Sequence, residues 1–184
     1  MTVLVALLAA VVALLVVLVA GLLRGQAGIL LSLAELRARL GSGPGTVAAS
    51  APGRRAVDVV GLTPTGDPIA IRVGGEPDPT LLVFLSSACT MCAGFWEAFG
   101  RRLRLPGRTQ LVVVTKGADA EQPERIAALA PPGVAVVMST EAWAAYGVEF
   151  APHFVLVDGT AGAVVAQGFA STWREVVEVL GAVR

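Results

Sequence analysis

An uninterrupted run of 21 apolar residues near the start of the chain constrains its fold more than any other feature. Residues 3–23 carry no charge, and all 14 basic and 14 acidic residues of the 184-residue chain follow them. As a helix this run extends about 31 Å, which matches the hydrocarbon thickness of a bilayer. The sequence therefore predicts one transmembrane helix within residues 1–23, followed by a folded domain.

A cleaved signal peptide is the alternative interpretation of this run. Signal peptides usually have a basic start and an apolar stretch of about 7–15 residues. Here the stretch is longer, no basic side chain precedes it, and no clear cleavage site follows it. An uncleaved anchor is therefore the favoured prediction. Arg24, Arg37 and Arg39 follow the anchor, and the positive-inside rule taken alone places such a basic flank in the cytoplasm.

Residues 24–55 are predicted to connect the anchor to the domain. Apolar side chains recur every three or four positions over residues 28–40, which indicates a short amphipathic helix. This helix can rest on the membrane or on the domain, or it can form a homodimer contact through residues 29–40. Residues 41–55 are rich in Gly, Pro, Ala and Ser, as is typical of a flexible linker. The predicted domain then covers residues 56–184.

The domain alternates short β-branched runs with segments of helical periodicity. This alternation predicts an α/β fold in which helices cover a mixed β-sheet, with a tight hairpin turn between the last two strands. The predicted strands are residues 57–60, 81–85, 111–115, 134–138, 154–157 and 164–167, with an additional strand or hairpin arm at 69–73. The predicted helices are residues 89–105, 121–129, 140–146 and 171–183.

Both cysteines of the chain lie in one motif, Cys89-Thr90-Met91-Cys92, just after a predicted strand and at the start of a predicted helix. A helix N-terminus presents unpaired N–H groups and a partial positive charge, which favour the thiolate form of Cys89. Cys92 lies one turn further along, where it can reach the Cys89 sulfur and is better protected. The motif therefore predicts a redox pair in which Cys89 attacks and Cys92 resolves the mixed disulfide. A metal half-site and a chemically inert motif are the alternatives.

The composition argues against several other classes of function. The net charge is zero and no tract of Lys or Arg is present, so nucleic-acid binding has no electrostatic support. One histidine and two cysteines cannot complete a four-ligand structural zinc site within one chain. No nucleotide-binding or zinc-protease motif occurs. The sequence therefore predicts no cofactor beyond a redox-active Cys89–Cys92 disulfide.

Residues 56–184 resemble the thioredoxin superfamily. In that family a cis-proline packs against the CxxC disulfide, and the residue before it offers its backbone to substrate peptides. The resemblance implies that Pro152 is this proline and that Ala151 contacts substrates; a trans-proline that opens an edge strand is the alternative. The resemblance rests on LLVFLSSACTMC at 81–92, YGVEFAPHFVLVD at 146–158, and GAVVAQG at 162–168 ahead of a final helix.

With its N-terminal half included, the chain resembles the methylamine dehydrogenase accessory protein family and, more broadly, membrane-tethered bacterial thiol-disulfide oxidoreductases. The features that carry this resemblance are the apolar span, the segment RGQAGILLSLAELRARLG at 24–41, the loose linker and the SSACTMC active site. It implies a single-pass cell-membrane protein whose domain lies outside the cytoplasm. It also implies protein substrates that carry thiols or disulfides, and a membrane electron-transfer partner. The lack of further cysteines agrees with an oxidising compartment.

The chain departs from thioredoxin at three places. Ala88 precedes the first cysteine where thioredoxin has Trp, and Thr90-Met91 stand where thioredoxin has Gly-Pro. Val83 stands where thioredoxin has a buried acid, so proton transfer from Cys92 lacks that helper. These departures favour a dedicated enzyme over a general cytosolic reductase.

The remaining candidate residues flank the motif. Thr90 and Met91 are expected to shape the active site, with Met91 as an apolar contact for a partner. His153 is either a proton donor or third metal ligand, or a half-buried polar residue that points away. Two rival functions use the same residues: a Cu(I) chaperone built on Cys89, Cys92 and His153, since soft thiolates bind Cu(I), and a non-enzymatic assembly factor.

Overall fold

The computed structural model describes residues 53–101, 105 and 107–182. The predictions for the membrane anchor, for the helix at 28–40 and for its dimer contact lie outside these residues. Within the described ranges, no helix combines the length and the apolar composition that crossing a bilayer requires.

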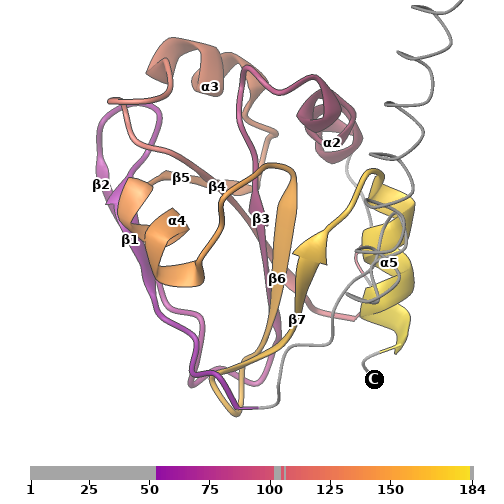
Figure 1. The fold of residues 1–184 in the computed structure, drawn as a ribbon. Helices are drawn as coiled ribbons and strands as arrows, with labels where there is room; N and C mark the ends of the chain where they lie inside the picture. The colour runs from indigo at the N-terminus through magenta and orange to yellow at the C-terminus, as the bar shows by residue number, and fades with distance from the viewer. Residues whose placement is uncertain (1–52, 102–104, 106, 183–184) are drawn as a thin grey trace, which may run out of the picture. The chain divides into compact units, whose positions relative to one another are not determined.

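The described strands form one mixed sheet. They are β1 (Val59–Leu62), β2 (Pro68–Ile71), β3 (Thr80–Phe84), β4 (Gln110–Thr115), β5 (Ala135–Met138), β6 (His153–Asp158) and β7 (Ala163–Phe169). Their order across the sheet is β2-β1-β5-β4-β3-β6-β7 (Figure 1). The central strands β5, β4 and β3 are parallel, and the outer pairs run antiparallel. The mixed sheet and the additional hairpin arm are thereby confirmed.

Helices cover both faces of this sheet. In the described residues they are α2 (Thr90–Gly100), α3 (Pro123–Leu129), α4 (Thr140–Tyr146) and α5 (Trp173–Ala182). Side chains of α2, α3 and α5 join one apolar cluster, and those of α4 join the cluster on the other face. Alternate residues of β3 supply both clusters: Leu81 and Val83 the first, Leu82 and Phe84 the second. A strand that is buried on both faces needs apolar side chains at consecutive positions, which explains the continuous apolar sequence of β3.

The first strand begins at Val59 instead of the predicted residue 57. The N–H of Val57 donates to the hydroxyl of Tyr146 at 3.1 Å, and that hydroxyl donates to the Val57 carbonyl at 2.6 Å. These two bonds hold the Val57 backbone against α4. Strand β1, which pairs with β2, therefore starts two residues later than predicted.

Three helices are shorter than predicted, and one of them, α5, begins at Trp173 instead of residue 171. The described helix α2 ends at Gly100 and not at residue 105, because glycine is a weak helix former and Arg101 adopts a turn. Helix α3 begins at Pro123 and not at Glu121. Proline is favoured at the first position of a helix, because it lacks an N–H and the N–H groups there have no partner within the helix. Glu121 thereby lies ahead of the helix, in the loop that follows β4.

Candidate active site

The cysteine motif follows β3, at the edge of the sheet where the parallel strands end. Cys89 is the N-cap of α2, with an extended backbone at φ −85° and ψ 118°. Its sulfur accepts a hydrogen bond from the N–H of Cys92 at 3.4 Å. Both thiols are free in this structure. The first cysteine thus lies at the positive end of the helix dipole, and the second lies one turn away.

The two thiols differ in exposure and in acidity. Cys92 is 0% exposed, whereas Cys89 is partly exposed. Burial, reinforced by the hydrogen bond with Cys89, raises the pKa of the Cys92 thiol to about 12. At neutral pH Cys92 is therefore a protonated and inaccessible thiol. Only Cys89 can meet an incoming disulfide.

The segment Ala151-Pro152 lies against Cys89. Its peptide bond is cis, as the family resemblance implies. Pro152 is buried, and the thiol of Cys89 donates to the carbonyl of Ala151 at 3.6 Å. Strand pairing causes this proximity: His153 at the start of β6 lies opposite Phe84 at the end of β3. The residues before β6 therefore adjoin the loop after β3.

Exposed apolar side chains lie on the two segments that meet at the Cys89 sulfur. Met91, inside the motif, is 49% exposed, and Phe150, just before Ala151, is 74% exposed. Thr90 is also exposed, in the first turn of α2. Exposed apolar groups beside a reactive thiol can contact apolar residues that surround a substrate cysteine. The sequence analysis missed Phe150, whose only signal was its position next to the Ala-Pro pair.

His153 does not join the cysteines. Its ring lies 6.5 Å from that of Phe84 in an edge-to-face arrangement. Phe84 belongs to the apolar cluster beneath α4, whereas Cys92 belongs to the cluster on the opposite face. Burial lowers the pKa of His153, so the ring is neutral at neutral pH. Within the described residues, no group of three His, Cys, Asp or Glu side chains lies close enough to hold a metal ion.

A buried carboxylate that the sequence analysis missed lies beside the loop before the motif. Glu121 is 8% exposed, and its Oε2 accepts a hydrogen bond from the Ser87 hydroxyl at 2.6 Å. The Ser87 N–H also faces both carboxylate oxygens at 3.3 Å. In contrast, Glu76 and Asp78, the acids nearest upstream of the motif, precede β3 and so lie at its other end.

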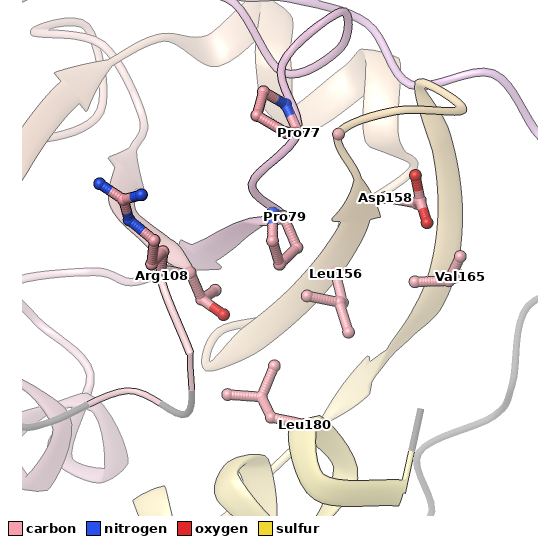
Figure 2. A pocket seen from close by; sticks show the side chains of 9 residues that line it. Pro77, Pro79, Arg108, Leu156, Asp158, Val165 and Leu180 are labelled. Carbon is pink, nitrogen blue, oxygen red and sulfur yellow. The ribbon is translucent and has the colours of Figure 1, made fainter. Parts of the chain in front are cut away.

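A cavity of about 320 Å³ opens at the end of the sheet away from the cysteines (Figure 2). Near its rim, Nε of Arg108 lies 3.9 Å from Oδ2 of Asp78, and both side chains are exposed. No cysteine or histidine is among the described residues that line it, so it takes no part in thiol chemistry. Its lining includes Pro77, Pro79, Leu156, Asp158, Val165 and Leu180.

Comparison with known proteins finds similarity in solved structures. No protein-family model and no curated protein matches the chain. The thioredoxin domain of a thiol-disulfide oxidoreductase from Bacteroides vulgatus is 15% identical, with a TM-score of 0.53 over 72% of this chain and 96% of that chain. The pneumococcal exposed lipoprotein thioredoxin from Streptococcus pneumoniae strain TIGR4 is 16% identical, with a TM-score of 0.56 over 68% and 99%. A peroxiredoxin-like protein from Aquifex aeolicus is 16% identical, with a TM-score of 0.57 over 76% and 92%.

At these identities the matches establish the fold and leave the activity open. They agree with the mixed sheet and its flanking helices. The domain that the structure describes has a thioredoxin-like fold.

Proposed function

We propose that this protein is a membrane-tethered thiol-disulfide oxidoreductase that acts on cysteines of exported proteins through Cys89 and Cys92. The observation that supports this most directly is the difference between the two thiols. Cys89 is accessible at a helix N-terminus, and Cys92 is buried one turn behind it. With one accessible and one buried sulfur, the pair suits two successive thiol-disulfide exchange steps. The same difference disfavours a metal site, in which both sulfurs would have to reach one ligand.

The proposed reduction proceeds in two exchange steps. The Cys89 thiolate attacks a substrate disulfide, forms a mixed disulfide and releases the first substrate thiolate. Cys92 then loses its proton and attacks the Cys89 sulfur, which releases the second substrate thiolate and leaves a Cys89–Cys92 disulfide. The substrate gains two electrons and the pair loses two. Run in reverse, the same steps oxidise a substrate dithiol.

The backbone of Ala151 is the proposed alignment site for the substrate segment around the attacked sulfur. Its carbonyl already lies within reach of the Cys89 thiol. Met91 and Phe150 add exposed apolar surface on the two segments that meet at this sulfur, and Thr90 is exposed in the first turn of α2. This arrangement supports a polypeptide substrate, which can use backbone and apolar contacts together.

Tethering and location are part of the proposal. The charge-free run at residues 3–23 supports a single membrane span. The lack of cysteines beyond the CxxC pair supports a domain outside the cytoplasm, because a stray thiol could mispair in an oxidising compartment. One similar structure is that of an exposed lipoprotein thioredoxin, which supports such a location for this fold. Each turnover leaves the cysteine pair in the opposite redox state. A membrane electron-transfer partner that resets the pair is therefore also proposed.

The reduction potential of the Cys89–Cys92 pair tests the proposed function. The full-length protein in mild detergent is equilibrated in glutathione or dithiothreitol buffers, and free thiols are counted by maleimide mass tagging. We expect a reversible two-electron couple. A reduction potential of about −270 mV indicates a reductant, and one of about −120 mV indicates an oxidant. The Cys89→Ser and Cys92→Ser variants serve as controls that cannot form the bond. A wild-type protein that forms no reversible intramolecular disulfide contradicts the proposal.

A further inference from the structure

Phe150 has the largest exposed fraction, 74%, among the exposed large apolar side chains of the described residues. Single apolar side chains are common on protein surfaces and carry no function by themselves. Phe150 differs from the others in its place along the chain. It directly precedes Ala151, whose carbonyl oxygen lies 3.6 Å from the Cys89 sulfur. Its exposure is therefore an exposure beside the one accessible thiol.

The backbone on both sides of Phe150 is fixed to the domain. Helix α4 is followed by Gly147, whose φ of 67° turns the chain out of the helix. Val148 is then buried, and its N–H donates to the carbonyl of Trp143 at 2.9 Å. Pro152 is buried two residues after Phe150. The aromatic side chain thus stands on a short segment with two buried ends, so a partner that contacts it orders little additional backbone.

Met91 supplies apolar surface from the other segment that meets at the Cys89 sulfur. It lies in the first turn of α2 and is 49% exposed. Residues 86–96 and 150–157, which make up the two segments, contain no Asp, Glu, Lys or Arg. A charged substrate side chain that loses water here gains no ionic partner from them, whereas an apolar one gains contact area. Glu149, exposed just before the second segment, disfavours an acidic side chain further.

We propose that Phe150 is a specificity-determining residue through which this protein selects substrate cysteines that have a large apolar side chain next to them in sequence. The inference rests on the function proposed above and names its substrate class. Neighbouring residues of a polypeptide lie about 3.8 Å apart, so a side chain adjacent to the attacked cysteine reaches the surface of Phe150 and Met91. Large apolar side chains are mostly buried once a protein has folded. The substrates are therefore polypeptides that have not finished folding.

A trapping reaction tests this assignment. The parent protein is the full-length Cys92→Ser variant in mild detergent, mixed with water-soluble peptides whose one cysteine carries thionitrobenzoate as a mixed disulfide. Attack of Cys89 on the peptide sulfur releases one coloured thionitrobenzoate and leaves the peptide bonded to Cys89, because the variant has no second cysteine to displace it. The peptides have equal length and net charge and carry either phenylalanine or serine beside the cysteine. The measured quantity is the ratio of the two second-order rate constants.

We expect the parent protein to trap the phenylalanine peptide about tenfold faster than the serine peptide, as one aromatic contact allows. Phe150→Ser should lower this ratio to about threefold, the part that Met91 still supplies. Phe150→Leu keeps a large apolar side chain and should restore most of the preference.

Val60→Ser is the matched control. It also removes an exposed apolar side chain, but β1 is separated from β3 by β5 and β4. This variant should keep the full ratio of the parent protein. A ratio that falls as far in Val60→Ser as in Phe150→Ser would show that surface apolarity in general, and not Phe150, sets the preference, which would overturn the assignment.

An unchanged ratio in Phe150→Ser would also overturn it. So would an equal loss of rate with both peptides, because that indicates a disturbed Cys89 and not a lost contact. Self-association that disappears in Phe150→Ser while the ratio stays the same would assign the side chain to a contact between copies instead. Ellman's reagent separates this failure from that of the proposed function. A parent protein that reacts with the reagent but does not discriminate between the peptides loses only the substrate assignment, whereas one that reacts with neither loses the oxidoreductase proposal itself.

Discussion

Cys89 and Cys92 carry the same side chain, yet the fold gives them different chemistry because one caps α2 and the other lies inside it. The cap position exposes Cys89 to the helix N-terminus and to solvent. The interior position removes Cys92 from water entirely. The assignment of Cys89 as the proposed attacking sulfur therefore follows from position along one helix turn.

Burial of Cys92 predicts a loss of stability in alkali. Its folded-state pKa is raised from 9.0 to about 12, so the folded chain keeps a proton that the unfolded chain releases. The free energy of unfolding of the reduced protein should therefore fall as pH rises above about 9. Burial raises the pKa of Tyr146 as well, which adds a loss of the same sign.

Urea unfolding in the presence of reductant, repeated across the alkaline range, measures this loss. Cys92→Ala should show a shallower decline with pH than the wild type, whatever its stability at neutral pH. Tyr146→Phe separates the tyrosine contribution. A decline in Cys92→Ala that parallels the wild type would show that Cys92 is not the group responsible.

At the scale of elements, β1 and β5 approach so closely that one residue must lack a side chain. A Cβ on Gly61 would overlap the carbonyl oxygen of Met138 and crowd Val137 and Ser139. Gly94, on the exposed side of α2, has nothing within 4 Å of such an atom. The same substitution should therefore have opposite effects at the two positions.

Gly61→Ala should destabilise the protein by about 1–3 kcal/mol, because the backbone of β5 must move to admit a methyl group. Gly94→Ala should stabilise it by about 0.5–1 kcal/mol, because alanine is the better helix former. Urea unfolding followed by tryptophan fluorescence gives both values. If the two variants unfold at the same urea concentration, the close approach of β1 to β5 is wrong.

At the scale of the molecule, local patterns in the sequence predicted most of the architecture. The apolar periodicity of β3 and the helical spacing of α2 depend on neighbours within a few residues, so the strand, the helix and the cysteines between them could be placed. The contact of Glu121 with Ser87 joins residues 34 positions apart, and no local pattern encodes it. The hydrogen bond from the Tyr146 hydroxyl to the Val57 carbonyl joins residues 89 positions apart. No local pattern encodes this bond either, so the later start of β1 could not be predicted from the sequence.

Membrane orientation is the prediction that belongs to the whole chain. If the domain lies outside the cytoplasm, the single exposed thiol of the Cys92→Ser variant should react with a membrane-impermeant maleimide on intact cells. The double variant Cys89→Ser, Cys92→Ser has no thiol and serves as the control. Labelling of Cys92→Ser only after lysis would instead place the domain in the cytoplasm, as the positive-inside rule predicts from the arginines that follow the charge-free run.

The burial of Cys92 also sets the stoichiometry of covalent complexes. Because only Cys89 of the two cysteines is accessible, the proposed function allows each domain one mixed disulfide at a time, however many partner thiols surround it. In that function, two partner chains are not joined covalently through the same domain. Any covalent complex captured from this protein should therefore contain one partner chain per copy.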